Sequence, residues 1–141
     1  MKRNGSAVWQ GNLKQGKGTV STASGVLSNT QYSFSARFEN GAGTNPEELL
    51  AAAHAGCFAM AFSGQLGEAG LTAERIDVTA TITLEKTDSG FAITESHLEL
   101  KARIPGADAA AFDKAAANAK AGCPVSTLFN TRITLNAALE S

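Results

Sequence analysis

Hydrophobic and polar residues alternate with a period of two in several stretches of the chain, which is typical of strands with one buried face. Residues 31–38 alternate in this way, and so do residues 75–86. Residues 91–104 resume the pattern after the turn Asp88-Ser89-Gly90, so 75–86 and 91–104 predict a long antiparallel hairpin. Shorter strands are predicted at residues 7–13, 19–22 and 132–139.

The segment from residue 46 to about 68 loses this alternation and predicts a long helix. Asn45 is a candidate N-cap, Pro46 suits the first helical position, and Glu48 follows three residues after the cap. Beyond Glu48 the segment is apolar almost all round, with His54 as its main polar interruption. A helix apolar on most sides is buried on most sides. We therefore expect a central helix, or one shared with a partner subunit.

A second helix is predicted from residue 109 to about 121, because Asp108 can cap it and Gly122 can end it. Pro124 can open a further short helix through about residue 128. The predicted order is βββ-α-ββ-α-β, which is an α+β pattern. At 141 residues the chain is expected to form a single domain, 1–141.

Composition narrows the class of protein. The chain is 43% hydrophobic and 18% charged, with a net charge of −1, so it offers no basic surface for a nucleic acid. The N-terminus shows no apolar signal-peptide core, and we expect no stretch long and apolar enough to span a membrane. A cytoplasmic protein with neither nucleic-acid nor membrane partner is the resulting expectation.

The chain has two cysteines, Cys57 and Cys123, far apart in sequence. Cytosolic thiols are kept reduced, so a purely structural disulfide is disfavoured there. Two such thiols suggest a redox pair, in which one thiolate attacks an oxidant and the other resolves the product as a disulfide. The alternative is that both are buried small hydrophobes with no chemistry.

The residues alone leave the attacking thiol open. Cys123 precedes Pro124 and would lie at the positive end of the short helix, which lowers a thiol pKa. Cys57 lies mid-helix, roughly 15 Å from Glu47 along the axis. Arg37, expected on the polar face of the 31–38 strand, would favour a Cys57 thiolate only if it lies beside it. Arg37 could equally be an ordinary solvated strand residue.

His54 stands three residues before Cys57, so the two side chains could touch on one helix. That pair has the residue types of a thiol hydrolase, although a buried helix leaves little room for an acyl substrate. His54 and Cys57 could also join His97 and Cys123 around zinc, but their spacing matches no metal motif. The plainest alternative is a core or interface histidine whose nitrogens are satisfied.

Five runs carry a resemblance that covers nearly the whole chain. They are Gly16-Lys17-Gly18-Thr19, Ser35-Ala36-Arg37-Phe38, Thr44-Asn45-Pro46-Glu47-Glu48-Leu49, Ala53-His54-Ala55-Gly56-Cys57-Phe58 and Ala121-Gly122-Cys123-Pro124-Val125-Ser126. With these runs the chain resembles the OsmC/Ohr family of bacterial osmotically inducible and organic hydroperoxide resistance proteins, and is closer to its OsmC branch. The resemblance implies a cofactor-free, thiol-dependent peroxidase for organic hydroperoxides in oxidative or osmotic stress defence. It also implies an intertwined homodimer, with a long central helix on antiparallel sheets and active sites at the subunit interface.

Carried over residue by residue, the resemblance implies that Cys57 is the peroxidatic cysteine and Cys123 the resolving one. It makes Arg37 the cation that activates the thiolate and Glu47 the carboxylate that holds Arg37. Arg37 would then bridge the gap between Glu47 and Cys57, with Arg37 and Glu47 from one subunit and Cys57 from the other. The resemblance also implies an external dithiol reductant, similar to the lipoyl type. The main rival function is a non-enzymatic dimeric module that binds a small hydrophobic ligand.

Overall fold

The computed structural model describes residues 1–140 of the chain. These residues form two compact units, the first comprising residues 1–49 and the second beginning at Leu50. The backbone is continuous through the long helix α2, Pro46–Glu68, whose first turn belongs to the first unit.

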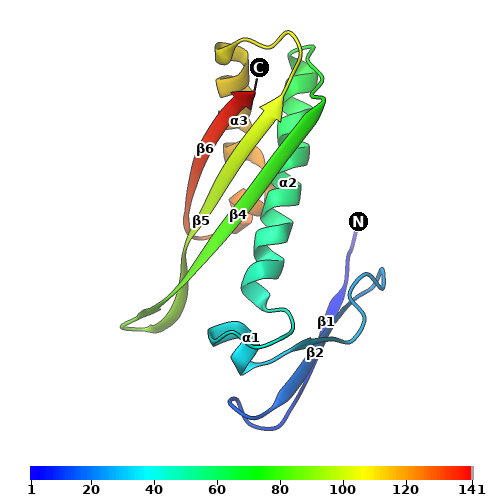
Figure 1. Cartoon of the computed structure of the whole chain (residues 1–141), viewed down its shortest axis with the longest axis vertical. Helices are drawn as coiled ribbons and strands as arrows, with labels where there is room; N and C mark the ends of the chain where they lie inside the picture. Colours follow the sequence, from blue (N-terminus) through cyan, green and yellow to red (C-terminus); the bar gives the residue numbers. More distant parts are fainter. Residues whose placement is uncertain (141) are drawn as a thin grey trace. The chain divides into compact units, whose positions relative to one another are not determined.

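The first unit contains a small antiparallel sheet and one short helix (Figure 1). The sheet has the order β1-β2-β3, and its strands are β1 Gly5–Gln10, β2 Lys17–Thr22 and β3 Thr30–Tyr32. Helix α1, Phe34–Phe38, follows directly. Gly18 of β2 lies where Trp9 and Tyr32 come together, and any side chain at this position would collide with both rings. Glycine is therefore what allows the two aromatic rings to cover β2.

The strand predicted over residues 31–38 is wrong beyond Tyr32. Ser33 accepts a hydrogen bond from the N–H of Ala36 (3.1 Å) and caps α1. Phe34 and Phe38 then lie one helical turn apart, with ring centroids separated by 4.9 Å. Alternating aromatic residues therefore fit a strand and a helix equally, and the serine cap decides for the helix. Arg37 consequently lies on a helix rather than on the polar face of a strand.

The second unit contains the three-stranded sheet β4-β5-β6 and three helical segments. Its elements beyond α2 are β4 Arg75–Thr87, β5 Gly90–Arg103, α3 Ala109–Gly122, α4 Pro124–Leu128 and β6 Arg132–Glu140. The predicted hairpin is confirmed by the antiparallel pairing of β4 with β5. The sheet is not wholly antiparallel as expected, because β6 pairs parallel to β5. The intervening helices α3 and α4 provide the crossover that a parallel pair requires.

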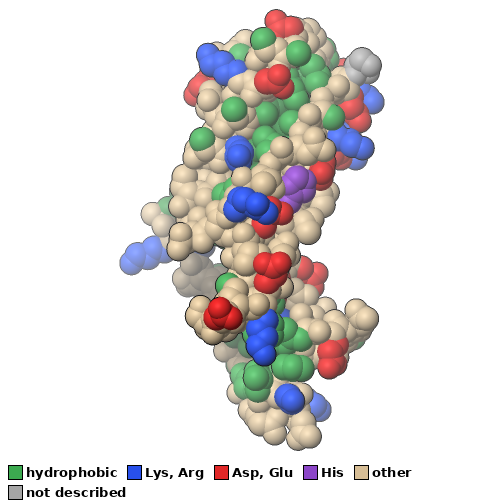
Figure 2. Space-filling model, turned by 90° about the vertical axis from the view of Figure 1, so that its left-hand side faces the viewer, with side chains coloured by type: hydrophobic (Ala, Val, Ile, Leu, Met, Phe, Trp, Pro, Cys, Tyr) green, Lys and Arg blue, Asp and Glu red, His purple; other side chains and the backbone are tan. Residues whose placement is uncertain are grey.

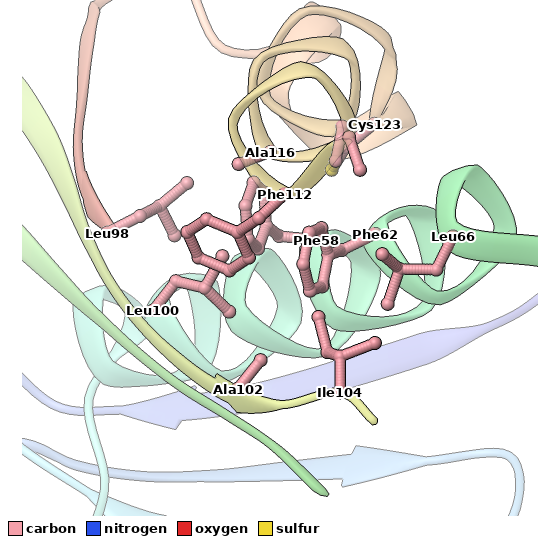
Figure 3. Packing of buried hydrophobic residues seen from close by; sticks show 12 residues of the cluster. Phe58, Phe62, Leu66, Leu98, Leu100, Ala102, Ile104, Phe112, Ala116 and Cys123 are labelled. Carbon is pink, nitrogen blue, oxygen red and sulfur yellow. The ribbon is translucent and has the colours of Figure 1, made fainter. Parts of the chain in front are cut away.

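Helices α2 and α3 lie on the same face of this sheet (Figure 1). The core between them is built from Phe58 and Phe62 of α2, Leu98 and Leu100 of β5, and Phe112 of α3, all nearly inaccessible to solvent (Figure 3). Phe62 meets Phe112 edge to face, with centroids 5.7 Å apart. The burial of large apolar side chains by both layers is what fixes α2 against the sheet.

Helix α2 is buried along one stripe only. The buried residues, His54, Phe58, Phe62 and Leu66, recur at every fourth position. The expectation that the helix is buried on most sides is therefore wrong for the single chain. By length and composition α2 could cross a membrane, which also differs from the sequence expectation. A core helix of a soluble protein meets the same criterion, and one stripe of α2 packs into the core of the second unit.

Candidate functional site

The two cysteines lie together in the second unit. Cys57 projects from the middle of α2, and Cys123 links the end of α3 to the start of α4. Figure 3 shows Cys123 at the end of α3, beside the phenylalanines of α2. Both thiols are free, and each one shifts the pKa of the other. Cys57 is partly exposed whereas Cys123 is fully buried, so a solute reaches Cys57 first.

Cys123 occupies the N-cap of α4, as the sequence predicts. The helix begins at Pro124, which suits this position because proline lacks the N–H that would be unpaired there. The N–H of Ser126 donates to Cys123 Sγ (3.5 Å). A sulfur at a helix N-terminus receives backbone N–H groups and the positive end of the helix dipole, and both favour a thiolate.

This environment separates the acidities of the two thiols. Burial raises the pKa of Cys57, the Val125 N–H lowers it in part, and the neighbouring Cys123 raises it again. Burial opposes ionisation of Cys123 too, but hydrogen bonds from the Ser126 N–H, the Cys57 thiol and the Ser126 hydroxyl hold its pKa below the ordinary value. These causes lower the pKa of Cys123 and raise that of Cys57, in the direction that the position of Cys123 before Pro124 predicts.

His54 lies in the core with no exposed surface. Its Nδ1 lies 2.6 Å from Ser96 Oγ and its Nε2 lies 2.7 Å from Ser126 Oγ, and Phe129 packs edge-on against the ring. Burial lowers the pKa of His54, so the ring is neutral at physiological pH. With both nitrogens engaged, His54 is neither a free base for Cys57 nor a metal ligand. Among residues 1–140, no three His, Cys, Asp or Glu side chains are grouped to hold a metal ion.

The predicted cation and carboxylate form a close pair in the first unit. Arg37 Nη2 donates to Glu47 Oε1 (2.8 Å), and Arg37 Nε lies 3.0 and 3.2 Å from the two carboxylate oxygens. Glu47 belongs to the first turn of α2 and its side chain is only 12% exposed. The Arg37 guanidinium also lies over the Phe38 ring, 5.1 Å from its centroid. Such a two-pronged clamp fixes the plane of the guanidinium.

Arg37 lies at the edge of a small apolar hollow of about 240 Å³. Aromatic and aliphatic side chains supply most of its wall, and the lining residues are Trp9, Leu13, Tyr32, Ser33, Phe34, Arg37 and Phe38. Figure 2 shows hydrophobic side chains at the surface beside a basic one in this part of the chain. An apolar wall with one fixed cation suits a ligand that has an apolar body and a polar or anionic end.

The structure thus brings the four predicted site residues together as two pairs, Arg37 with Glu47 and Cys57 with Cys123. Ser96 and Ser126, which occupy the two nitrogens of His54, were not among the predicted site residues. Ser126 carried a usable signal, because it is the third residue of the helix that Pro124 opens, where a side chain is close to the N-cap. Ser96 carried none, because a serine within a strand usually faces solvent.

Comparison with known proteins places the chain among relatives that match most of its length. A family model described as OsmC-like protein matches residues 39–138. Peroxiredoxin OsmC of Escherichia coli K12 is 54% identical over 139 residues, covering 99% of this chain and 97% of that protein.

Solved structures share the fold. An organic hydroperoxide resistance protein OsmC of Legionella pneumophila is 25% identical with a TM-score of 0.67, covering 98% of this chain and 97% of that one. An OsmC-like protein of Vibrio cholerae reaches a TM-score of 0.77 at 17% identity, covering 97% and 99%. Since a family model spans most of the chain and a relative matches it from end to end, the chain belongs to the OsmC family.

Proposed function

We propose that this protein reduces organic hydroperoxides to alcohols with two thiols, Cys57 as the attacking and Cys123 as the resolving cysteine. The chain is a thiol-dependent peroxidase of stress defence, in line with its 54% sequence identity to Peroxiredoxin OsmC. The observation that carries the residue assignment is a pair of free thiols that shift each other's pKa, one partly exposed and one buried at a helix N-terminus.

Each step of the reaction balances with these two thiols. The Cys57 thiolate attacks the distal peroxide oxygen, the O–O bond breaks, and the alkoxide takes up a proton to leave as an alcohol. The resulting Cys57 sulfenic acid is attacked by the Cys123 thiolate, and a disulfide and water form. An external dithiol, of lipoyl type, then reduces the disulfide by thiol exchange. No cofactor takes part.

The order of the two cysteines follows from access rather than acidity. Cys123 is the more acidic thiol within the pair, but it has no exposed surface, so a hydroperoxide meets Cys57. A Cys57 thiolate then needs a cation to offset the burial that raises its pKa. We assign that role to Arg37, held in place by Glu47. The apolar hollow beside Arg37 supports an organic hydroperoxide rather than hydrogen peroxide as the substrate.

We further propose that the working molecule is a homodimer formed through α2. A second stripe on this helix is exposed and free of charge, and its residues are Ala53, Gly56, Met60, Ser63, Gly64 and Gly67. Any Cβ added at Gly56, Gly64 or Gly67 would meet only open space in the single chain. Small residues let another helix approach closely. Such a dimer would bury the apolar surface that the single chain leaves exposed. We propose that this dimer is cytoplasmic.

The decisive experiment counts thiols and measures intact mass on the reduced protein, before and after one equivalent of cumene hydroperoxide. We expect both thiols to disappear with a mass loss of about 2 Da per chain, as one disulfide forms. Cys57→Ser should abolish the reaction, whereas Cys123→Ser should allow one oxidation and then stall with Cys57 overoxidised. Two free thiols after the treatment, or equal residual turnover in both variants, would contradict the proposal and favour a ligand-binding module.

A further inference from the structure

The buried polar groups of the second unit are connected in a line that ends at Cys123. Ser96 of β5 contacts His54 Nδ1, and His54 Nε2 contacts Ser126 Oγ of α4. The backbone N–H of Ser126 in turn donates to Cys123 Sγ (3.5 Å), and the Ser126 hydroxyl lowers the pKa of Cys123. All four side chains are buried. A buried polar network is costly unless every member is satisfied, and among the described residues no buried side-chain N or O atom lacks a partner.

Counting protons in this line leaves one consistent arrangement when Cys123 is ionised. The Ser126 hydroxyl has a single proton, so it can donate to Cys123 Sγ only if its oxygen accepts a hydrogen bond from His54 Nε2–H. A neutral His54 with its proton on Nε2 must accept a hydrogen bond at Nδ1, and the Ser96 hydroxyl donates that bond. Each donor therefore points towards the sulfur, in the order Ser96, His54, Ser126.

The surroundings of His54 keep the ring in this neutral form. Burial alone lowers the pKa of His54. The groups that face the ring are serine hydroxyls from β5 and α4 and the Phe129 ring, and the titratable groups that adjoin this line are the thiols Cys57 of α2 and Cys123. On β5, the alternation of the strand places Glu95 and His97 on the face opposite Ser96. No counter-charge is thus provided for an imidazolium.

We propose that Ser96, His54 and Ser126 form a hydrogen-bond relay that stabilises the Cys123 thiolate, with His54 as the positioning residue of the resolving step. The inference rests on the two-cysteine mechanism proposed above. In that step the Cys123 thiolate attacks the Cys57 sulfenic sulfur, the S–S bond forms and the S–O bond breaks. The departing hydroxide combines with the proton that Cys123 gave up, so that water leaves. The relay lets a fully buried thiol ionise, and a thiol rather than a thiolate would not attack.

The relay is tested first by the acidity of Cys123 in a Cys57→Ser background, measured from thiolate ultraviolet absorbance against pH. Ser126→Ala removes the hydroxyl but keeps the backbone N–H, and should raise the pKa of Cys123 by about one pH unit, as expected for one lost hydrogen bond to a charged group. His54→Leu should give a similar rise. His54→Gln, which retains a donor for Ser126, should restore most of the wild-type value.

Matched controls separate the relay from general effects of substitution. Ser89→Ala removes a serine hydroxyl in the β4–β5 turn, and His97→Gln replaces the other histidine on the outer face of the sheet; both should leave the Cys123 pKa unchanged. A purely structural role for His54 would lower the stability of the His54→Leu variant without moving the Cys123 pKa in that variant. An unmoved pKa in Ser126→Ala would overturn the relay, whatever the folding of His54→Leu.

The second test follows disulfide formation in the two-cysteine protein after one equivalent of cumene hydroperoxide, by rapid quenching and mass. Ser126→Ala should lose the Cys57 thiol at the wild-type rate but form the disulfide about threefold to tenfold more slowly at neutral pH. The range reflects a smaller thiolate fraction, partly offset by the greater nucleophilicity of a more basic thiol. An unchanged rate of disulfide formation would contradict the relay. Failure of wild-type Cys57 to oxidise would instead contradict the peroxidase mechanism, and the Cys123 titration would still decide the relay.

Discussion

Arg37 donates from Nε and Nη2 to the Glu47 carboxylate oxygens over distances of 2.8 to 3.2 Å. The orientation of the guanidinium therefore depends on Glu47. We expect Arg37→Ala to slow the oxidation of Cys57 by about tenfold or more, because the thiolate loses its cation. Glu47→Gln should slow it less, since an amide oxygen still accepts from Arg37. The measurement is the rate of Cys57 thiol loss under single-turnover conditions.

A matched control for Arg37 lies on β4. Arg75 donates to both oxygens of Asp77 at 2.7 and 2.8 Å, which is the same kind of clamp on an exposed sheet surface. Arg75→Ala should therefore leave the oxidation rate unchanged. If Arg37→Ala were as fast as Arg75→Ala, Arg37 would have no part in activating Cys57.

The burial of His54 predicts how the free energy of unfolding depends on pH. Because burial lowers the pKa of His54 in the folded chain from 6.5, the unfolded chain binds the proton more readily. The contribution of neutral His54 to the free energy of unfolding is fully present above about pH 6.5. It is lost as the pH falls towards the folded-state pKa of His54. Denaturant unfolding between roughly pH 5 and 8, at fixed protein concentration, should show the free energy of unfolding falling on acidification.

His54→Gln cannot titrate, so its unfolding free energy should depend less steeply on pH across this window, while His97→Gln should retain the slope due to His54. Asp77 and Glu99 do not interfere, because their ion-pair and hydrogen-bond partners lower pKa values that are ordinarily 3.8 and 4.5. Identical slopes for the wild type and His54→Gln would show that His54 is not the titrating group.

Local chemistry at single residues was the most predictable part of the molecule. Asn45 accepts from the Glu48 N–H (2.8 Å) and Asp108 from the Ala111 N–H (2.7 Å), so both predicted caps are confirmed. Cys123 at the start of α4 is confirmed in the same way. These features depend on a few adjacent residues. The contacts of His54 could not be predicted, because Ser96 and Ser126 are 42 and 72 residues distant in sequence.

At the scale of elements, sequence patterns predicted the long helix and the hairpin well, because each pattern persists over many residues. The prediction failed where one pattern fits two structures. The aromatic alternation that ends at Phe38 became helix α1 through the Ser33 cap. The amphipathic stripe of α2 was also hidden, since alanine and glycine fill its exposed face and leave no polar side to reveal it.

The exposed stripe of α2 leads to a prediction about assembly. Met60 is 79% exposed in the single chain, at the centre of the uncharged stripe. If this stripe is the dimer contact, Met60→Glu would bury an unpaired charge there and should raise the dimer Kd by at least about tenfold. Sedimentation velocity over a range of concentrations measures the change.

Val26 provides the control for this substitution. It is 85% exposed in the loop before β3, so Val26→Glu makes the same kind of change away from α2. We expect Val26→Glu to sediment as the wild type does. A Met60→Glu protein that sediments like Val26→Glu would exclude α2 as the contact between subunits.

At the scale of the whole molecule, the α+β class was predictable from the order of elements, but the pairing of β6 was not. Nothing within residues 132–139 distinguishes parallel from antiparallel pairing; the direction follows from the crossover through α3 and α4. That the chain forms a single domain stays a prediction. The roles of Arg37, Glu47, Cys57 and Cys123 likewise stay predictions that the geometry of each pair supports.

The division of the site residues into two pairs predicts complementation between subunits that are each impaired. If Arg37 and Glu47 of one subunit serve Cys57 of the other, a mixed dimer of Arg37→Ala with Cys57→Ser contains one complete site, because the first chain supplies Cys57 and the second supplies Arg37. Co-expression with two different tags isolates this dimer. Its turnover of cumene hydroperoxide should reach about half that of the wild type, far above either variant alone. If both residues of a site came from one subunit, neither site would be complete, and the mixed dimer would be no faster than the mean of its parents.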